Sequence, residues 1–569
     1  MTNVGANPSS SSTPNEVEEP RRSKRAKVVK DFGSDFLTYN VDDEPLTFRQ
    51  AMDSSESRHW KGAVKSEMDS IVYNGTWELV DLPPGCSTIG CKWVFKRKLN
   101  PDGSIDKYKA RLVAKGFRQR EGIDYFDTYS PVARMTTIRM LIALASVHGL
   151  IVHQMDVKTA FLHGDLEEEI YMDQPEGFIA SGNERKVCKL VKSIYGLKQA
   201  PIDWHKKFDE TVLAFEFLVN ESYKCVYYKV RGNECVIVCL YVDDILLFGT
   251  NIAIINETKS FLKRHFEMKD MGEASMILGI KLTLSTDGIT LSQSHYIEKS
   301  ILEKYGYSNC RFASTPYDPK VALVKNSSGV PVSQLRYSQI IGSLQYLANV
   351  TRPDISYSVS KLARYTSCPN KTHWEALDRV LRYLKGTISL GLHYRRFPGV
   401  LEGYSDASWI AKKSGSNGVT GYVFTLAGGA VSWKCSRQTL ITRSTFEAEL
   451  CALDATGTEA EWLHGLMSML PVVSKPLPAI SVHCDSRTTI DKIRSVKYNA
   501  KTKRHIQVRL KSIRGLVSDR VIAIEFIGTQ DNIADPLTKG LEHAVVLKSR
   551  LGMGLVTHHG SSTAGTQYT

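Results

Sequence analysis

Two adjacent carboxylates in an apolar hairpin are the first feature of this sequence that could do chemistry. Asp243 and Asp244 follow an apolar run that begins at Val236 and precede another that ends at Phe248. This pattern predicts two buried strands joined by a tight turn that carries both acids. Because adjacent buried carboxylates are costly to ionise, a divalent cation would stabilise them. Asp is also a common turn former, so the hairpin alone fits a purely structural turn equally well.

A third acid strengthens the case for metal binding. Asp156 ends an apolar segment that begins at Val152, where a strand would deliver it to the edge of a sheet. A single buried Asp is often only hydrogen-bonded structure, but Asp156 and the hairpin acids together make the three-carboxylate set that two hard cations require. Between these motifs, Gly196 permits close approach of the backbone, and Gln199 offers both a donor and an acceptor.

A second set of acids lies in the C-terminal third of the chain. Asp406 and Asp485 each end a predicted strand, Glu449 lies in a predicted helix, and Asp535 follows the last predicted strand. Singly, each acid fits a helix cap or a turn, but together they predict a second two-metal site. Glu447 and Glu449 cannot share a helix face, so only one of them can be a ligand.

The elements that must position these acids are both strands and helices. Apolar periodicity predicts helices over 48–71 and 135–151 and a final strand over 521–526. Lys109 and Arg111 would lie on one face of a basic strand, which suits phosphate binding. Lysines that protect the edge of a sheet explain the same strand equally well.

The composition indicates a soluble chain of several domains with a polyanionic partner. Its 569 residues suggest roughly three to four domains. A net charge of +13 favours nucleic acid before membrane, and no apolar run could span a bilayer. Eleven cysteines without a Cys-x-x-Cys pair indicate neither a zinc site nor disulfides. The first residues lack the apolar core of a signal peptide, so we expect an intracellular protein.

The N-terminal region has a different composition from the rest. Residues 1–40 are rich in Ser, Pro and charge, which predicts disorder. The basic run 21–27 fits a nuclear-import signal or a nucleic-acid-binding arm, and a solvated run of charge explains it more simply.

Five motifs, in this order, resemble the reverse transcriptase of copia-type retrotransposons. They are Lys92–Lys96, Tyr108–Gly116, Met155–Leu162, Tyr195–Pro201 and Tyr241–Asp244. The resemblance implies a multi-domain α+β fold, in which a right-hand polymerase with fingers, palm and thumb precedes a ribonuclease H-like mixed α/β domain. Two positions depart from the family pattern: Ile202 replaces an Arg, and Tyr223-Lys224 replaces Ser-Asp.

The resemblance also implies roles for single residues of the polymerase. Asp156, Asp243 and Asp244 would bind two magnesium ions, with manganese as an alternative. The substrate-binding residues would be Lys109 and Arg111 for the triphosphate, Phe161 for rejecting a sugar 2′-hydroxyl, and Gln199 for the nascent base pair. Leu278–Gly279 resembles the hairpin that grips the primer end.

The C-terminal acids resemble the ribonuclease H of the same elements. This implies that Asp406, Glu449, Asp485 and Asp535 are catalytic and bind two further ions, with Asp535 at the open edge of the site. Glu449 is chosen over Glu447 because the family's ligand is followed by Leu-x-Ala, as it is here. Some ribonucleases H carry a histidine in the region where this chain has Thr529.

The resemblance extends over about residues 45 to 545 and sets the expected domain bounds. These are a disordered basic arm similar to an integrase tail (1–44), fingers and palm (45–290), a thumb and connection region (291–396), a ribonuclease H-like domain (397–545) and a disordered tail (546–569). No protease or integrase core is expected, so the chain would be a polyprotein fragment or a truncated copy.

The implied activity is RNA-directed DNA synthesis with ribonuclease H cleavage, in an element that undergoes DNA integration. The implied partners are an RNA template, a DNA primer, RNA–DNA hybrids and deoxynucleoside triphosphates, with self-association left open and no membrane. The expected location is the cytoplasm, within virus-like particles, or the nucleus. The alternative is a catalytically silent element remnant that only binds nucleic acid.

Overall fold

The structure is a computed structural model that describes residues 44–99, 105–128, 130–131, 133–326, 332–409, 418–495 and 503–557. Pro45–Thr569 forms a unit separate from Met1–Glu44. The predicted basic arm therefore lies outside the described residues, apart from Glu44. None of the described helices is long and apolar enough to cross a membrane.

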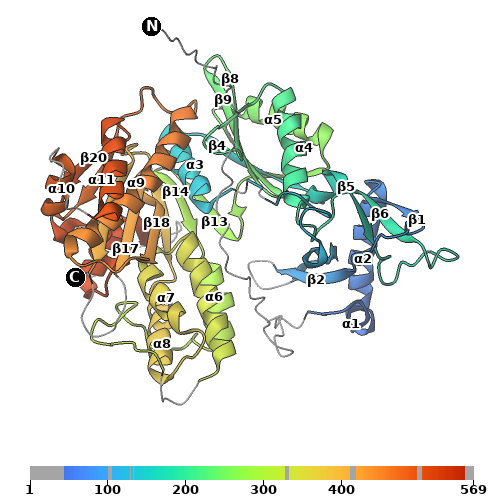
Figure 1. Ribbon diagram of the computed structural model, residues 1–569, viewed down its shortest axis with the longest axis horizontal. Helices are drawn as coiled ribbons and strands as arrows, with labels where there is room; N and C mark the ends of the chain where they lie inside the picture. The colour runs from blue at the N-terminus through green and yellow to red at the C-terminus, as the bar shows by residue number, and fades with distance from the viewer. Residues whose placement is uncertain are drawn as a thin grey trace, which may run out of the picture. The chain divides into compact units, whose positions relative to one another are not determined.

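A six-stranded sheet carries the hairpin acids, and helices cover both of its faces (Figure 1). Helices α4 (Ala200–Ala214) and α5 (Ile252–His265) pack on one face, and α3 (Met135–His148) packs on the other. Two covered faces explain why the strands around the hairpin are almost continuously apolar. In sheet order, the strands are β11 (Met268–Glu273), β4 (Ile151–Val157), β10 (Asp244–Gly249), β9 (Glu234–Tyr241), β8 (Val226–Arg231) and β7 (Leu218–Val219).

We call this six-stranded sheet, with its covering helices, the palm. Two smaller sheets and two helices precede and interrupt it. The predicted helix 48–71 is in fact two helices, because the backbone of Ser54 is extended and its hydroxyl donates to Ala51 O over 2.9 Å. The helices are α1 (Phe48–Asp53) and α2 (Ser57–Tyr73), and the paired strands are β2 (Cys91–Leu99) with β3 (Ile105–Ala114), and β1 (Trp77–Val80) with β6 (Val187–Lys192) and β5 (Asp165–Met172).

A five-stranded sheet joins segments that are far apart in the chain. Its strands are β12 (Met276–Ile277), β13 (Ile280–Ser285), β14 (Gly288–Ser292), β15 (Leu390–Arg395) and β21 (Leu555–Thr557). Between β14 and β15 the chain forms a π-helix (Tyr296–Glu303) and the helices α6 (Gln334–Val350), α7 (Ser356–Leu362) and α8 (Lys371–Lys385).

The predicted disordered tail, 546–569, is wrong for its first part. Helix α12 (His543–Gly552) and strand β21 are ordered, and Val546 and Leu555 are buried. β21 pairs with β15 so that Leu555 lies opposite Leu392. A strand of three residues is too short to show a periodic pattern in the sequence. It also follows the strand that the sequence predicts to be the last.

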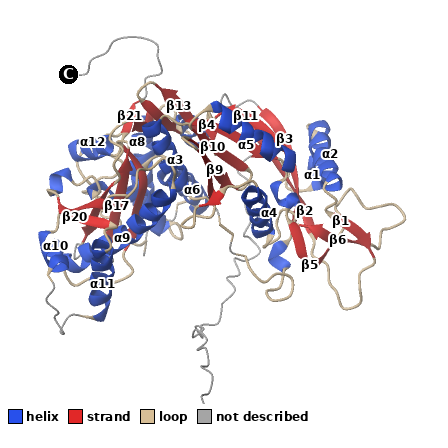
Figure 2. Cartoon of the chain, turned by 90° about the horizontal axis from the view of Figure 1, so that it is seen from above, coloured by secondary structure: helices blue, strands red, loops and turns tan. Residues whose placement is uncertain are grey.

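A second five-stranded sheet carries the C-terminal acids. Strand β16 pairs antiparallel with β17 and parallel with β19, which makes the sheet mixed. Helices α9 and α11 pack together beside it (Figure 2). The strands are β18 (Gly429–Arg437), β17 (Val419–Leu426), β16 (Glu402–Ser408), β19 (Ile480–Cys484) and β20 (Ile522–Phe526), and the helices are α9 (Thr445–Met469), α10 (Arg487–Arg494) and α11 (Arg504–Ser518).

One buried arginine connects three of these regions. Arg139 of α3 donates to Val431 O in β18 over 2.8 Å and to Asn349 O and Val350 O in α6 over 2.9 Å each. Its guanidinium also lies 3.9 Å from the ring centroid of Trp433. Burial lowers the pKa of Arg139 to about 10, so the side chain stays charged at neutral pH. The palm, the α6 helix and the C-terminal sheet are thus fixed to one another.

Candidate active sites

Strand pairing assembles the first acid site, which consists of Asp156, Asp243 and Asp244. Asp244 is the register partner of Asp156 across β10 and β4. The turn residue Val242 has a φ of 55°, a left-handed conformation that a β-branched residue rarely adopts. Trp204 of α4 holds this turn, since its indole NH donates to Val242 O over 2.9 Å. The predicted hairpin and the predicted position of Asp156 on a neighbouring strand are both confirmed.

The carboxylates of the first acid site make one another less favourable to ionise. Burial raises the pKa of Asp243, and the carboxylates of Asp156 and Asp244 raise it further. Burial raises the pKa of Asp244 as well, although Gln154 donates a hydrogen bond of 3.0 Å to it. One oxygen of Asp243, Oδ1, is buried without a hydrogen-bond partner among the described residues. A buried carboxylate oxygen of this kind fits a metal ligand.

The predicted triphosphate-binding residues lie close to these acids. Burial and the charge of Arg111 lower the pKa of Lys109, while Asp243 and Asp156 act in the opposite direction. Arg111 donates to Oε2 of the buried Glu67 over 2.7 Å, which fixes its guanidinium. The neighbouring Lys107 is exposed. Two cations of β3 therefore accompany the first acid site.

The predicted sugar-selecting residue belongs to an aromatic cluster. The Phe161 ring lies edge-on to the Tyr195 ring, with 4.9 Å between centroids, and the Arg111 guanidinium lies 4.7 Å from the Tyr195 centroid. Burial, with a contribution from Asp243, raises the pKa of Tyr195. Its hydroxyl is buried and has no hydrogen-bond partner within the described ranges. Tyr195 is thus a site residue that the sequence reasoning missed.

Gly196 was the signal that could have identified Tyr195. Its φ is +96°, and a Cβ there would lie 2.2 Å from Ala114 O, so the loop can approach β3 only with glycine at this position. The approach lets Ala114 N donate to Tyr195 O over 2.7 Å. The predicted need for close backbone approach at Gly196 is confirmed, and its effect is to place Tyr195.

Gln199 has hydrogen-bond partners within the chain. The side chain is only 3% exposed. Its Oε1 accepts from Gln119 over 2.9 Å, and its Nε2 donates to Asp124 O over 3.0 Å. Both ends of the amide are thus engaged with the 119–124 loop, and the contact of Gln199 with a nascent base pair stays a prediction.

The structure also shows where the remaining sequence features of the polymerase region lie. Leu278–Gly279 forms the turn between β12 and β13, with φ values of 50° and 77°, and Tyr346 of α6 donates to Leu278 O over 2.9 Å. Ile202 lies in the first turn of α4. Tyr223 contacts helix α9 instead, where its ring lies 5.5 Å from that of Trp462.

The second acid site consists of Asp406, Glu449, Asp485 and Asp535. The ligand atoms of Asp406, Asp485 and Asp535 lie within 4.8 Å of one another, as do those of Glu449, Cys484 and Asp485. Two overlapping sets that share Asp485 can hold hard cations through their carboxylates. The parallel pairing of β16 with β19 brings the carboxyl ends of these strands to the same edge of the sheet.

Burial strongly perturbs the second acid site. It raises the pKa of Asp406 to about 7 and that of Glu449 to about 9, and neighbouring carboxylates add to both shifts. Thr538 Oγ1 donates to Asp406 Oδ2, and Thr529 Oγ1 donates to Asp485 Oδ2 over 2.8 Å. Clustered acids with raised pKa values indicate a functional site.

The structure decides between the two glutamates of α9. Glu449 is 8% exposed and interacts electrostatically with Asp406 and Asp485. Glu447 accepts a hydrogen bond of 2.8 Å from Arg443 N, and its Oε1 lies 3.7 Å from Lys503 Nζ. The structure therefore places Glu449, and not Glu447, among the other three acids.

The expected open edge of this site is wrong. Asp535 is 4% exposed, and Asp406 is 2% exposed. Asp485 is the more accessible acid, being only partly buried. The reason is that Asp535 begins a 3-10 turn, Asp535–Leu537, whose residues are all buried.

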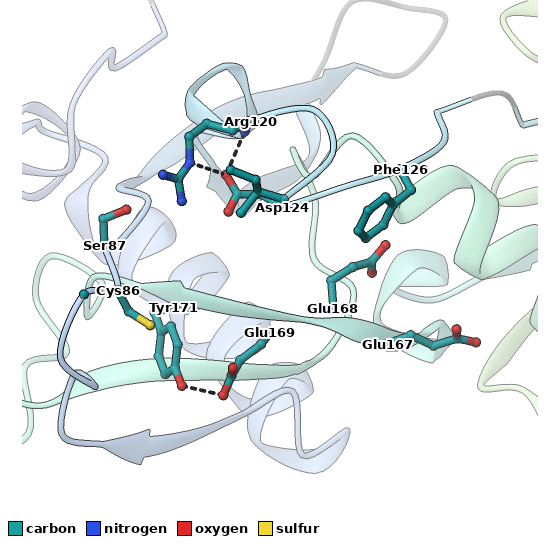
Figure 3. Close-up of a pocket in the computed structure, with 11 residues that line it drawn as sticks. Cys86, Ser87, Arg120, Asp124, Phe126, Glu167, Glu168, Glu169 and Tyr171 are labelled. Carbon is teal, nitrogen blue, oxygen red and sulfur yellow. Dashed lines mark hydrogen bonds and ion pairs between the residues drawn. The ribbon is translucent and has the colours of Figure 1, made fainter.

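A separate cavity is lined by none of the acids of the two sites. Figure 3 shows this cavity, of about 590 Å³, with Glu167, Glu168 and Glu169 on its wall. Glu169 accepts from the Tyr171 hydroxyl over 2.6 Å. None of the predicted catalytic residues lines it, and its acidic wall disfavours phosphate groups.

Comparisons with known proteins identify relatives of this chain. Residues 74–319 match the family model described as reverse transcriptase (RNA-dependent DNA polymerase). The chain is 41% identical over 530 residues to the retrovirus-related Pol polyprotein from transposon TNT 1-94 of Nicotiana tabacum, covering 91% of this chain and 40% of that protein. It is 35% identical over 308 residues to the transposon Ty5-1 protein of Saccharomyces cerevisiae, covering 54% of this chain and 100% of that protein.

Among solved structures, the foamy viral protease-reverse transcriptase in complex with dsDNA aligns with 13% identity and a TM-score of 0.46, covering 82% of this chain and 83% of that one. The chain spans less than half the length of the tobacco polyprotein. The sequence relatives, the family match over 74–319 and the acids of the palm hairpin lead to one conclusion. The chain belongs to the pol polyproteins of copia-type retrotransposons.

Proposed function

We propose that the chain is an RNA-directed DNA polymerase joined to a ribonuclease H. The observation that carries the proposal is the pairing of Asp156 with Asp244, beside Asp243 in a constrained turn, within the region that matches the family. A second set of four clustered acids on a separate sheet supports the second activity.

In the polymerase, Asp156, Asp243 and Asp244 would hold two Mg²⁺ ions, with Mn²⁺ as an alternative. Bound metal would supply activation of the primer 3′-hydroxyl and charge stabilisation of the leaving pyrophosphate. Lys109 and Arg111 would bind the triphosphate, and Glu67 would orient Arg111 for that contact. Fixed cations of this kind stabilise charge that develops during phosphoryl transfer.

Sugar selection and primer placement would come from neighbouring groups. The Phe161 ring, supported edge-on by Tyr195, would block a 2′-hydroxyl. The Leu278–Gly279 turn, held by Tyr346, would position the primer end. The natural substrates would be an RNA template, a DNA primer and deoxynucleoside triphosphates.

In the ribonuclease, Asp406, Glu449, Asp485 and Asp535 would hold the metal ions that activate water against the RNA strand of a hybrid. The Oε2 atom of Glu449 is buried and lacks a hydrogen-bond partner in the described part of the chain, which fits this role. The net charge of +13 suits hybrid binding through phosphates.

No observation favours the alternative of a catalytically silent remnant. Two departures from the family pattern, at Ile202 and Tyr223, were among the reasons to consider it. Ile202 lies in the first turn of α4, and Tyr223 packs against Trp462 of α9. Neither residue belongs to an acid site.

Primer extension and hybrid cleavage, both measured on each variant, test the proposal. Asp243→Asn should abolish primer extension on an RNA template and leave hybrid cleavage, whereas Asp485→Asn should do the reverse. Asp69→Asn is the matched control, because Asp69 is exposed on α2 and distant in sequence from both sets. Primer extension that survives Asp243→Asn would exclude the first acid site as the polymerase centre.

A further inference from the structure

A lysine lies inside the second acid site. Lys539 Nζ is 3.0 Å from Asp535 Oδ1, and the lysine side chain is 39% exposed against 6% for the acid. The positive charge of Lys539 also lowers the pKa of Asp406 and of Glu449, against the larger effect of burial. Its ammonium group therefore acts on the cluster as a whole and not on one carboxylate alone.

Backbone hydrogen bonds hold the segment that carries this lysine in a turn. The amide NH groups of Thr538 and Lys539 both donate to Asp535 O, over 3.1 and 3.3 Å. The same turn directs the Thr538 hydroxyl to Asp406 Oδ2. One five-residue segment thus contributes a carboxylate, a hydroxyl and an ammonium group to a single cluster.

In the absence of metal, a nearby positive charge lowers the free-energy cost of clustering these acids. Several carboxylates brought together out of water repel one another and lose hydration, and a nearby positive charge offsets part of that cost. A divalent ion at Asp535 would place a second cation within a few ångströms of the ammonium group. Two cations so close repel strongly in a poorly solvated site.

We propose that Lys539 is the resident counter-ion of the metal-free second acid site, and that a divalent cation displaces its ammonium group from Asp535 when it binds. The inference rests on the proposed metal binding by this site. Partial exposure of Lys539 gives the displaced side chain a path to solvent. Lys539 is then a positioning residue that stabilises the empty site and weakens its affinity for metal.

Removal of the charge should have opposite effects on these two properties. In Lys539→Met the unfolding midpoint in chelator should fall by roughly 2–4 °C. The Mn²⁺ dissociation constant, measured by calorimetry at pH 8, should fall on the order of tenfold. Lys539→Arg keeps the charge and should stay near the wild type in both measurements.

The matched control is another lysine of the same region. Lys548 Nζ lies 2.5 Å from Asp531 Oδ1 and both side chains are exposed, so Lys548→Met removes an ion pair that involves none of the four acids. It should change neither the midpoint in chelator nor the Mn²⁺ affinity. All variants carry Asp243→Asn, so that the first acid site contributes less to the titration.

The outcomes separate this inference from the proposed function. Loss of the Mn²⁺ signal in Asp485→Asn assigns the titration to the second acid site, and a signal unchanged by Asp485→Asn contradicts metal binding there. With the assignment made, tighter Mn²⁺ binding by Lys539→Met supports the counter-ion role, and unchanged or weaker binding overturns it. If Lys539→Met does not fold, Lys539→Gln provides the same measurement with a polar side chain.

Discussion

The two acid sites are built in different ways. In the first acid site, one sheet sets the positions, since Asp156 and Asp244 are partners across adjacent strands. Its balancing cations, Lys109 and Arg111, come from a separate two-stranded sheet. In the second acid site, two strand ends, a helix and a 3-10 turn each provide one acid, and the cation comes from the residues that follow Asp535.

The difference extends to how closely the carboxylates gather. Among the described residues, sets of three ligand atoms within 4.8 Å occur only at the second acid site. The acids of the first acid site share a register but not that spacing. The acids of the second acid site are therefore the more closely clustered of the two sets. Substitutions at the two sites should affect different activities.

The largest expected effect is at the first acid site. Asp156→Asn or Asp243→Asn removes a fixed negative charge that nothing else in the palm replaces, so primer extension should fall roughly 100- to 1,000-fold or more. Hybrid cleavage by the same variants should stay at the wild-type rate, because the acids of the two sites lie on different sheets. A parallel loss of both activities would mean that the sites are not independent.

The second acid site should be equally intolerant, and at all four positions. Asp406→Asn, Glu449→Gln and Asp485→Asn should each stop cleavage of RNA in a hybrid. Because Asp535 is buried and not at an open edge, Asp535→Asn should be as damaging as the others. A mild Asp535→Asn variant beside an inactive Asp485→Asn variant would contradict the burial argument.

Sequence patterns identified the first site better than the second. The apolar runs around Asp243 and Asp244 required buried strands, and strand pairing then determined the partner of Asp244. The burial of Asp535 depends on a 3-10 turn that leaves no periodic signal, so it could not be predicted from the sequence. The partners of Gln199, Gln119 and Asp124, could not be predicted from the sequence because they lie in a loop far from it along the chain.

A smaller effect is expected for sugar selection at the first acid site. Phe161→Val should raise the ratio of ribonucleotide to deoxyribonucleotide incorporation by roughly 10- to 100-fold, since removal of the ring opens space for one hydroxyl. The measurement is primer extension with each nucleotide set at matched concentrations. Phe178→Val, a change to a partly exposed ring that packs near Trp93, should leave the ratio unchanged.

The raised pKa values of the second acid site predict a pH dependence of stability. For Glu449 the pKa is about 9 in the fold against 4.5 for an ordinary glutamate, so between these values the folded chain binds a proton that the unfolded chain does not. Stability of the metal-free protein should therefore fall as pH rises through that window. Unfolding midpoints in chelator should show a shallower fall for Glu449→Gln, and an identical slope would contradict the assignment.

The smallest expected effect distinguishes the two glutamates of α9. Two residues along a helix turn a side chain by about 200°, which directs Glu447 away from the acids that surround Glu449. Glu447 instead accepts from Arg443 N at the start of the helix, and a glutamine oxygen can accept the same bond. Its ion pair with Lys503, at 3.7 Å, is long and half exposed on the lysine side, so its loss should cost little. Glu447→Gln should therefore keep hybrid cleavage within about twofold of the wild type, while Glu449→Gln abolishes it. Cleavage rates of the two variants test this assignment. An inactive Glu447→Gln beside an active Glu449→Gln would make Glu447 the ligand, and the cluster of four acids that distinguishes this site from the first would then be wrong.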